Sequence, residues 1–88
     1  MPYTVREFEP TPNPNAVKCV LDAVISAEPR SYRKAADAAA DSLASALFAI
    51  EGVVNVLICA DFITIGREPG AKWPPIKREV QRVLSAAP

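Results

Sequence analysis

The sequence predicts an α+β fold: a two-layer sandwich of β-β-α-β-β-α order, with a mostly antiparallel sheet and both helices on one face. Three observations lead there. Short runs rich in β-branched and aromatic residues are separated by turn residues, which is typical of strands. Two longer segments carry apolar residues at helical spacing. The runs 53–59 and 62–67 are nearly adjacent, which favours an antiparallel hairpin. We expect a single domain over residues 1–88.

Two strands with a proline-rich connection are predicted first. Residues 3–8 mix tyrosine, valine and phenylalanine with polar residues, and a glutamate-proline pair ends this run. Residues 16–21 form the second strand, with Cys19 among apolar neighbours on one face. Lys18 belongs to the other face, which we therefore expect to be partly exposed to water.

The middle of the chain carries weaker patterns. Residues 22–33 contain two short extended pieces, interrupted by Pro29, and give no clear element. Residues 34–50 are predicted to be helical, because alanine dominates and neither glycine nor proline interrupts. Asp41 is a candidate N-cap inside this segment, in which case the amphipathic helix begins there. Gly52 is the expected helix stop.

The last third predicts a hairpin and a helix. Residues 53–59 are almost wholly apolar, which indicates a central strand covered on both faces or nearly so. After a tight turn, residues 62–67 return as its partner. The second helix begins at Trp73, and the two prolines that follow are tolerated in a first helical turn. Its apolar stripe consists of Ile76, Val80, Val83 and Leu84.

Composition and charge exclude several classes of function. Ten basic and ten acidic residues cancel, so nothing drives the chain toward nucleic acid or a membrane surface. Histidine is absent, which removes the commonest general base and metal ligand, and no C-x-x-C motif occurs. We therefore expect no enzyme. The N-terminus lacks a signal-peptide pattern, so we expect a cytoplasmic protein whose Cys19 and Cys59 are reduced.

Four motifs occur in one order along almost the whole chain. They are TPNPN-x-x-K at 11–18, S-L-A-x-x-L-F-x-I-x-G-V at 42–53, D-F-I-T-I at 61–65, and Trp73 followed by Lys77. Together they resemble the N-terminal domain of the Nfu/NifU-type iron–sulfur cluster scaffold proteins. The resemblance implies a role in iron–sulfur cluster assembly or delivery. In the full-length relatives, a C-x-x-C motif in a separate C-terminal domain holds the cluster, so no residue here inherits that role.

Two functions remain open at this point. The first is an accessory or interaction module without a cofactor of its own, which binds an iron–sulfur scaffold, a C-x-x-C-bearing chain or a client apoprotein. The second is a direct carrier of iron or an iron–sulfur cluster, held between chains by Cys19, whose thiolate would suit such a metal. Against the second, a free cysteine in a strand is usually a small buried hydrophobe.

The candidate partner-binding residues fall into three groups. The TPNPN segment is stiff and poor in backbone donors, and serves either as a strand connector or as a contact surface. The tryptophan either packs over the sheet or anchors a partner. The basic residues form either a solvated helix face, with Arg67 near it, or a dock for an acidic partner. The set is Thr11, Pro12, Asn13, Pro14, Asn15, Lys18, Trp73, Lys77, Arg78 and Arg82.

Overall fold

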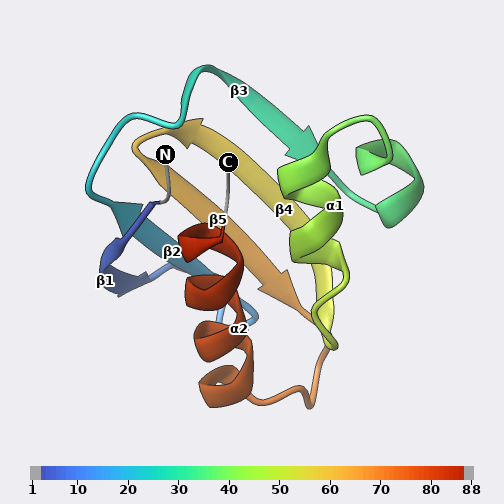
Figure 1. Ribbon diagram of the computed structural model, residues 1–88. Coiled ribbons are helices and arrows are strands. Elements are labelled where there is room, and N and C mark those ends of the chain that lie inside the picture. Colours follow the sequence, from blue (N-terminus) through green and yellow to red (C-terminus); the bar gives the residue numbers. More distant parts are fainter. Residues whose placement is uncertain (1–2, 87–88) are drawn as a thin grey trace.

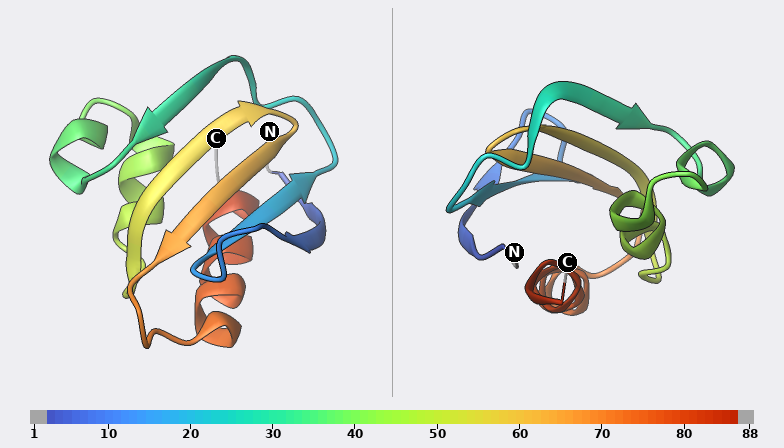
Figure 2. Two further views of the ribbon diagram at one scale, coloured as in Figure 1. Left: turned by 180° about the vertical axis from the view of Figure 1, so that it is seen from behind. Right: turned by 45° about the horizontal axis from the view of Figure 1, so that its top comes forward.

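An antiparallel sheet in the strand order β1-β2-β5-β4-β3 carries two α-helices on one face in the computed structural model (Figures 1 and 2). The structure describes residues 3–86. The right-hand view of Figure 2 shows α1 and α2 on the same side of the sheet. The elements are β1 (Val5–Pro10), β2 (Ala16–Leu21), β3 (Ser26–Tyr32), the 3₁₀ helix η1 (Ala35–Ala38), α1 (Ser42–Phe48), β4 (Val53–Ala60), β5 (Phe62–Arg67) and α2 (Trp73–Ser85).

The predicted α+β sandwich is confirmed, with one additional strand. β3 forms in the stretch without a clear pattern and pairs antiparallel with β4. Pro29 is tolerated there because β3 is an edge strand, and an edge residue can leave its backbone unpaired. The register between the two strands also shifts between Ser26 and Arg30, around that proline.

The helix predicted over residues 34–50 is wrong in its first half. That half contains the short 3₁₀ helix, and α1 begins only after Asp41. Asp41 has an extended backbone, with φ −110° and ψ 106°, and its side chain accepts a hydrogen bond from the Ala44 N–H. The predicted internal cap is therefore confirmed, and it outweighs the helix propensity of the alanines before it. Ala38 packs into the core from the 3₁₀ turn.

The core lies between the sheet and the two helices. Alternate residues of β2, β4 and β5 point to it, and the apolar stripe predicted for α2 meets them there. None of the described helices is long and apolar enough to cross a membrane. The side chains below 2% exposure include Cys19, Leu21, Leu47, Val56, Ile58, Ile63, Ile65, Val80 and Leu84.

The opposite face of the sheet is open, which corrects the prediction that residues 53–59 are covered on both faces. Val54 is 37% exposed, and Leu57 and Cys59 are only half-buried. Because both helices pack on one side of the sheet, β4 carries more apolar residues than this fold buries. Lys18 lies on the open face, as expected, and stacks over the Phe62 ring at 4.5 Å.

Two glycines with positive φ give a matched pair for a stability test. Gly52 (φ +94°) follows α1, and a Cβ there would lie 3.0 Å from the Ala71 Cβ and 3.3 Å from Ile76 Cδ1. Gly70 (φ +91°) has nothing within 4 Å of that position. We expect Gly52→Ala to lower the free energy of unfolding by about 2 kcal/mol and Gly70→Ala by about 1 kcal/mol. Urea denaturation checks this, and equal losses would show that the contacts at Gly52 yield without cost.

Candidate partner-binding site

A pocket of about 230 Å³ lies between the β1–β2 loop and the start of α2. It joins residues that are far apart in the sequence, and it contains much of the predicted partner-binding set. Its apolar walls come from both segments, while Lys77 is the charged side chain in the lining. The lining residues are Phe8, Pro10, Thr11, Asn13, Pro14, Ala16, Val17, Trp73 and Lys77.

The loop of residues 11–15 is fixed by its own polar groups. The Thr11 hydroxyl donates to the Asn13 carbonyl at 2.8 Å and accepts from the Asn13 N–H at 3.1 Å. Asn13 Oδ1 accepts from the Asn15 N–H at 2.9 Å, as expected for a turn asparagine. The Ala16 N–H, at the start of β2, donates to the Asn13 carbonyl at 3.0 Å. The loop therefore connects two strands and also presents a defined surface.

Arg67, the last residue of β5, holds this loop beside α2. Its guanidinium donates to the carbonyls of Ala71 at 2.8 Å and Pro14 at 3.4 Å. It also donates to Asn15 Oδ1 at 3.4 Å. The same group lies over the Trp73 ring, 4.7 Å from its centroid. We call this arrangement the Arg67 clamp. Sequence reasoning named Arg67 only as a neighbour of the basic residues, because no spacing rule connects a strand end to a loop so far away.

Lys77 lies at the other side of the pocket. Its ammonium is 5.1 Å from the centroid of the Phe8 ring, which is a cation–π contact. Among residues 3–86, Lys77 has no salt bridge: the three ion pairs are Lys18–Glu9, Arg30–Asp41 and Arg82–Glu79. Its positive charge is therefore available to a partner.

Three of the predicted residues lie elsewhere. Lys18 is on the open face of the sheet, paired with Glu9 at 3.8 Å. Arg82 bonds Glu79 at 2.8 Å and borders a separate groove between α1 and α2. Arg78 is exposed and is not part of the pocket lining. The structure thus brings the loop, Trp73 and Lys77 together and leaves the other basic residues on different surfaces.

Cys19 lies in the core rather than at the loop surface. Its side chain is 0% exposed, on the helix-covered face of β2. Burial raises the pKa of its thiol to about 12, against a smaller lowering by the charge of Lys77. Cys59 is half-buried on the open face, so the sheet separates the two thiols. Residues 3–86 hold no group of three or more His, Cys, Asp or Glu residues able to bind a metal ion. These residues do not fit a cluster site.

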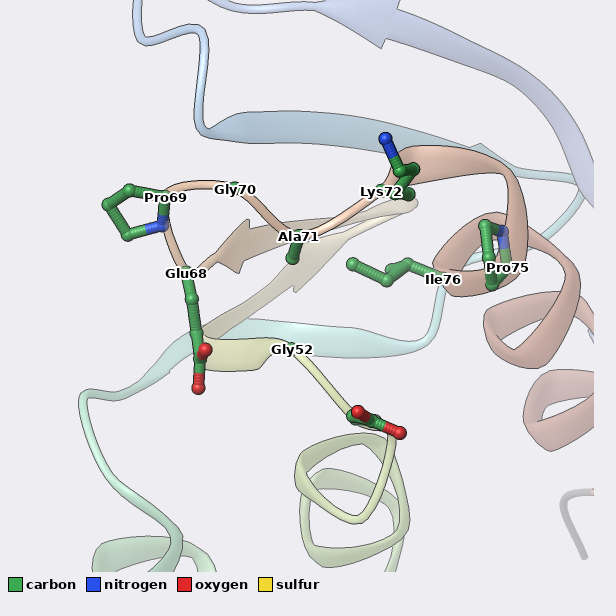
Figure 3. A pocket seen from close by; sticks show the side chains of 9 residues that line it. Gly52, Glu68, Pro69, Gly70, Ala71, Lys72, Pro75 and Ile76 are labelled. Atoms are coloured by element: carbon green, nitrogen blue, oxygen red, sulfur yellow. The ribbon is translucent and has the colours of Figure 1, made fainter.

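A second pocket, of about 550 Å³, lies next to the turn after α1. Figure 3 shows Ile76 and Ala71 pointing toward Gly52 across its floor. The charged ends of Glu68 and Lys72 point to opposite sides, so they do not converge on one ligand (Figure 3). Despite its size, this pocket gathers no set of groups with an evident chemistry.

Comparisons with known proteins agree with the fold and the motifs. The family described as "Scaffold protein Nfu/NifU N terminal" matches residues 5–87. This chain belongs to that family, and the resemblance inferred from the four motifs is confirmed. Among its relatives are the proteins named "NFU1 iron-sulfur cluster scaffold homolog, mitochondrial" of Drosophila erecta (36% identical) and Drosophila willistoni (38%), each over 80 residues and 89% of this chain. The chain spans only 28% of the length of these relatives.

Solved structures show the same fold in chains of similar size. The crystal structure of protein SAV1430 from Staphylococcus aureus has a TM-score of 0.76 at 25% identity, with 91% of this chain and 96% of that chain covered. The solution structure of SeR13 from Staphylococcus epidermidis has a TM-score of 0.58 at 26% identity, with 89% and 91% covered.

Proposed function

We propose that this domain is a non-catalytic interaction module in iron–sulfur cluster assembly or delivery. It binds an iron–sulfur scaffold, a C-x-x-C-bearing chain or a client apoprotein, and it does not hold the cluster itself. The family supplies the biological context. The observation that carries the interaction role is the Arg67 clamp, which fixes the loop of residues 11–15 beside Trp73.

The clamp favours binding because it orders the surface before a partner arrives. A loop that must be ordered on association lowers affinity, and a preformed loop avoids that cost. Two prolines and the internal hydrogen bonds of Thr11 and Asn13 restrict the loop further. Trp73 is half-buried beside this loop, and tryptophan is enriched among residues that dominate binding energy.

The alternative, a carrier with Cys19 as metal ligand, has less support. A ligand thiol must be deprotonated and reachable, whereas this thiol is buried and has its pKa raised to about 12. Binding a metal between chains would require Cys19 to become exposed from the core between the sheet and the helices. The cytoplasmic location stays a prediction from the sequence, and the fly relatives are named as mitochondrial.

The interaction role is tested by calorimetric titration of the purified domain with a purified C-x-x-C-bearing scaffold chain. We expect saturable binding that Arg67→Ala weakens about tenfold, because the loop would then have to be ordered on association at a cost of about 1.4 kcal/mol. Arg33→Ala is the control, because Arg33 is an exposed arginine that follows β3 at the other edge of the sheet. Far-ultraviolet circular dichroism verifies that both variants fold. An unchanged affinity in Arg67→Ala would show that the Arg67 clamp does not contribute to binding.

The carrier alternative is tested separately by anaerobic reconstitution with ferrous iron and sulfide. We expect a colourless, iron-free domain after desalting. Bound iron with a sulfur-to-iron charge-transfer band, lost in Cys19→Ser and kept in Cys59→Ser, would instead establish the carrier.

A further inference from the structure

We propose that the pocket between the β1–β2 loop and α2 binds a short acidic peptide segment of the partner protein. An apolar side chain of that segment enters the pocket, and a neighbouring carboxylate meets Lys77. This inference rests on the proposed function, because it specifies what the same surface recognises on its partner.

The size and walls of the pocket favour a single apolar side chain. Its volume of about 230 Å³ lies below the range of roughly 300–1,000 Å³ that is usual for small-molecule and cofactor sites. Its apolar lining includes the Phe8 and Trp73 rings and the pyrrolidine rings of Pro10 and Pro14. Contact with these rings removes an inserted aliphatic or aromatic group from water.

The polar groups of the pocket select for acceptors on the ligand. The Thr11 hydroxyl and Asn13 Oδ1 are already engaged within the loop. The prolines of the loop provide no N–H. Among residues 3–86, the side-chain donors of the lining that make no hydrogen bond are the Lys77 ammonium, the Asn13 amide NH₂ and the Trp73 indole N–H. Carboxylate or carbonyl oxygens of a ligand can accept from these groups, whereas a ligand that carries only donors cannot.

The charge of the pocket is positive on both sides. Lys77 stacks on Phe8, and Arg67 stacks on Trp73 at the adjoining edge. No acidic residue is found in the lining. Because the rings hold both cations in place, less side-chain entropy is lost when a carboxylate binds. An acidic protein segment fits better than a nucleic acid, since the chain has no net charge and the pocket is too small for a base with its phosphates.

Trp73 provides a direct signal for occupancy, because it is the only tryptophan and lines the pocket. The probe is a short peptide of alternating aspartate and leucine, blocked at both ends so that only side-chain carboxylates carry charge. The matched analogue has asparagine in place of aspartate. We expect the acidic peptide to change the tryptophan fluorescence saturably, and the asparagine analogue to bind about tenfold more weakly. Added salt should lower the affinity for the acidic peptide and leave the affinity for the asparagine analogue unchanged.

Lys77 variants test the assigned contact. Lys77→Gln should lower the affinity for the acidic peptide about tenfold and abolish its advantage over the asparagine analogue. Lys77→Arg should retain most of the affinity. Lys34→Gln, which removes an equal charge from an exposed site beyond β3, should behave as the unchanged domain does.

Two outcomes would overturn the inference: no saturable fluorescence change up to millimolar acidic peptide, or equal affinity for both peptides. If the scaffold chain binds while Lys77→Gln leaves its affinity unchanged, the acidic-segment inference fails and the proposed function stands. If the acidic peptide binds as described but no scaffold or client chain does, the pocket is correctly assigned and the proposed function fails.

Discussion

Raising the pH from about 9 to about 12 should lower the free energy of unfolding by about 4 kcal/mol through Cys19 alone. In the unfolded chain the thiol loses its proton above its ordinary pKa of 9.0, whereas burial keeps it protonated in the folded protein up to about pH 12. The unfolded state therefore binds fewer protons in this window, so stability falls as the pH rises. Below pH 9 this contribution is fully present. The expected slope is about 1.4 kcal/mol per pH unit.

Urea denaturation at several pH values within that window measures the slope. Subtracting the slope measured for Cys19→Ala isolates the contribution of Cys19 from those of tyrosine and lysine titrations. Cys59→Ala should show the same slope as the unchanged domain. Thiol labelling of the folded protein adds a second measurement, in which Cys59 reacts and Cys19 reacts only after unfolding. Rapid labelling of Cys19 in the native state would contradict the burial argument, and would reopen the carrier alternative.

Replacement of Asp41 by alanine should lower the free energy of unfolding by about 2 kcal/mol. Its carboxylate caps α1 by accepting a hydrogen bond from the Ala44 N–H at 3.1 Å. It also accepts a hydrogen bond from the Tyr32 hydroxyl at 2.8 Å and forms an ion pair with Arg30. Loss of the cap costs about 1 kcal/mol. The remainder comes from the lost ion pair with Arg30, whose side chain is 38% exposed, and from the lost hydrogen bond of the Tyr32 hydroxyl.

Chemical denaturation of Asp41→Ala and Asp37→Ala provides the comparison. Asp37 is exposed in the 3₁₀ turn, so its replacement should change stability by no more than about 0.5 kcal/mol. A second signal is the pKa of Tyr32, which the hydrogen bond to Asp41 raises above its ordinary value. It should fall in Asp41→Ala. A loss below 1 kcal/mol would indicate that water replaces the carboxylate at the cap.

Local patterns were sufficient for most of the fold. The backbone imposes a period of two on the strand of residues 16–21 and a helical period on the apolar stripe of α2. The short connection between β4 and β5 predicted their antiparallel pairing. The pattern failed at three places: β4 is covered on one face only, and at the other two tertiary context outweighs propensity. β3 accommodates Pro29 because it is an edge strand, and the alanines of residues 35–38 form a 3₁₀ turn ahead of the Asp41 cap.

For the site, the sequence by itself determined the stiff TPNPN loop, the family and the set of residue types available for chemistry. The tertiary structure decided which of them meet. It placed Trp73 and Lys77 beside the loop, with Arg67 joining the loop to Trp73, and it put Cys19 in the core. The physical reason is that alternation gives the two faces of a strand, whereas which face the helices cover depends on contacts between segments distant in the chain.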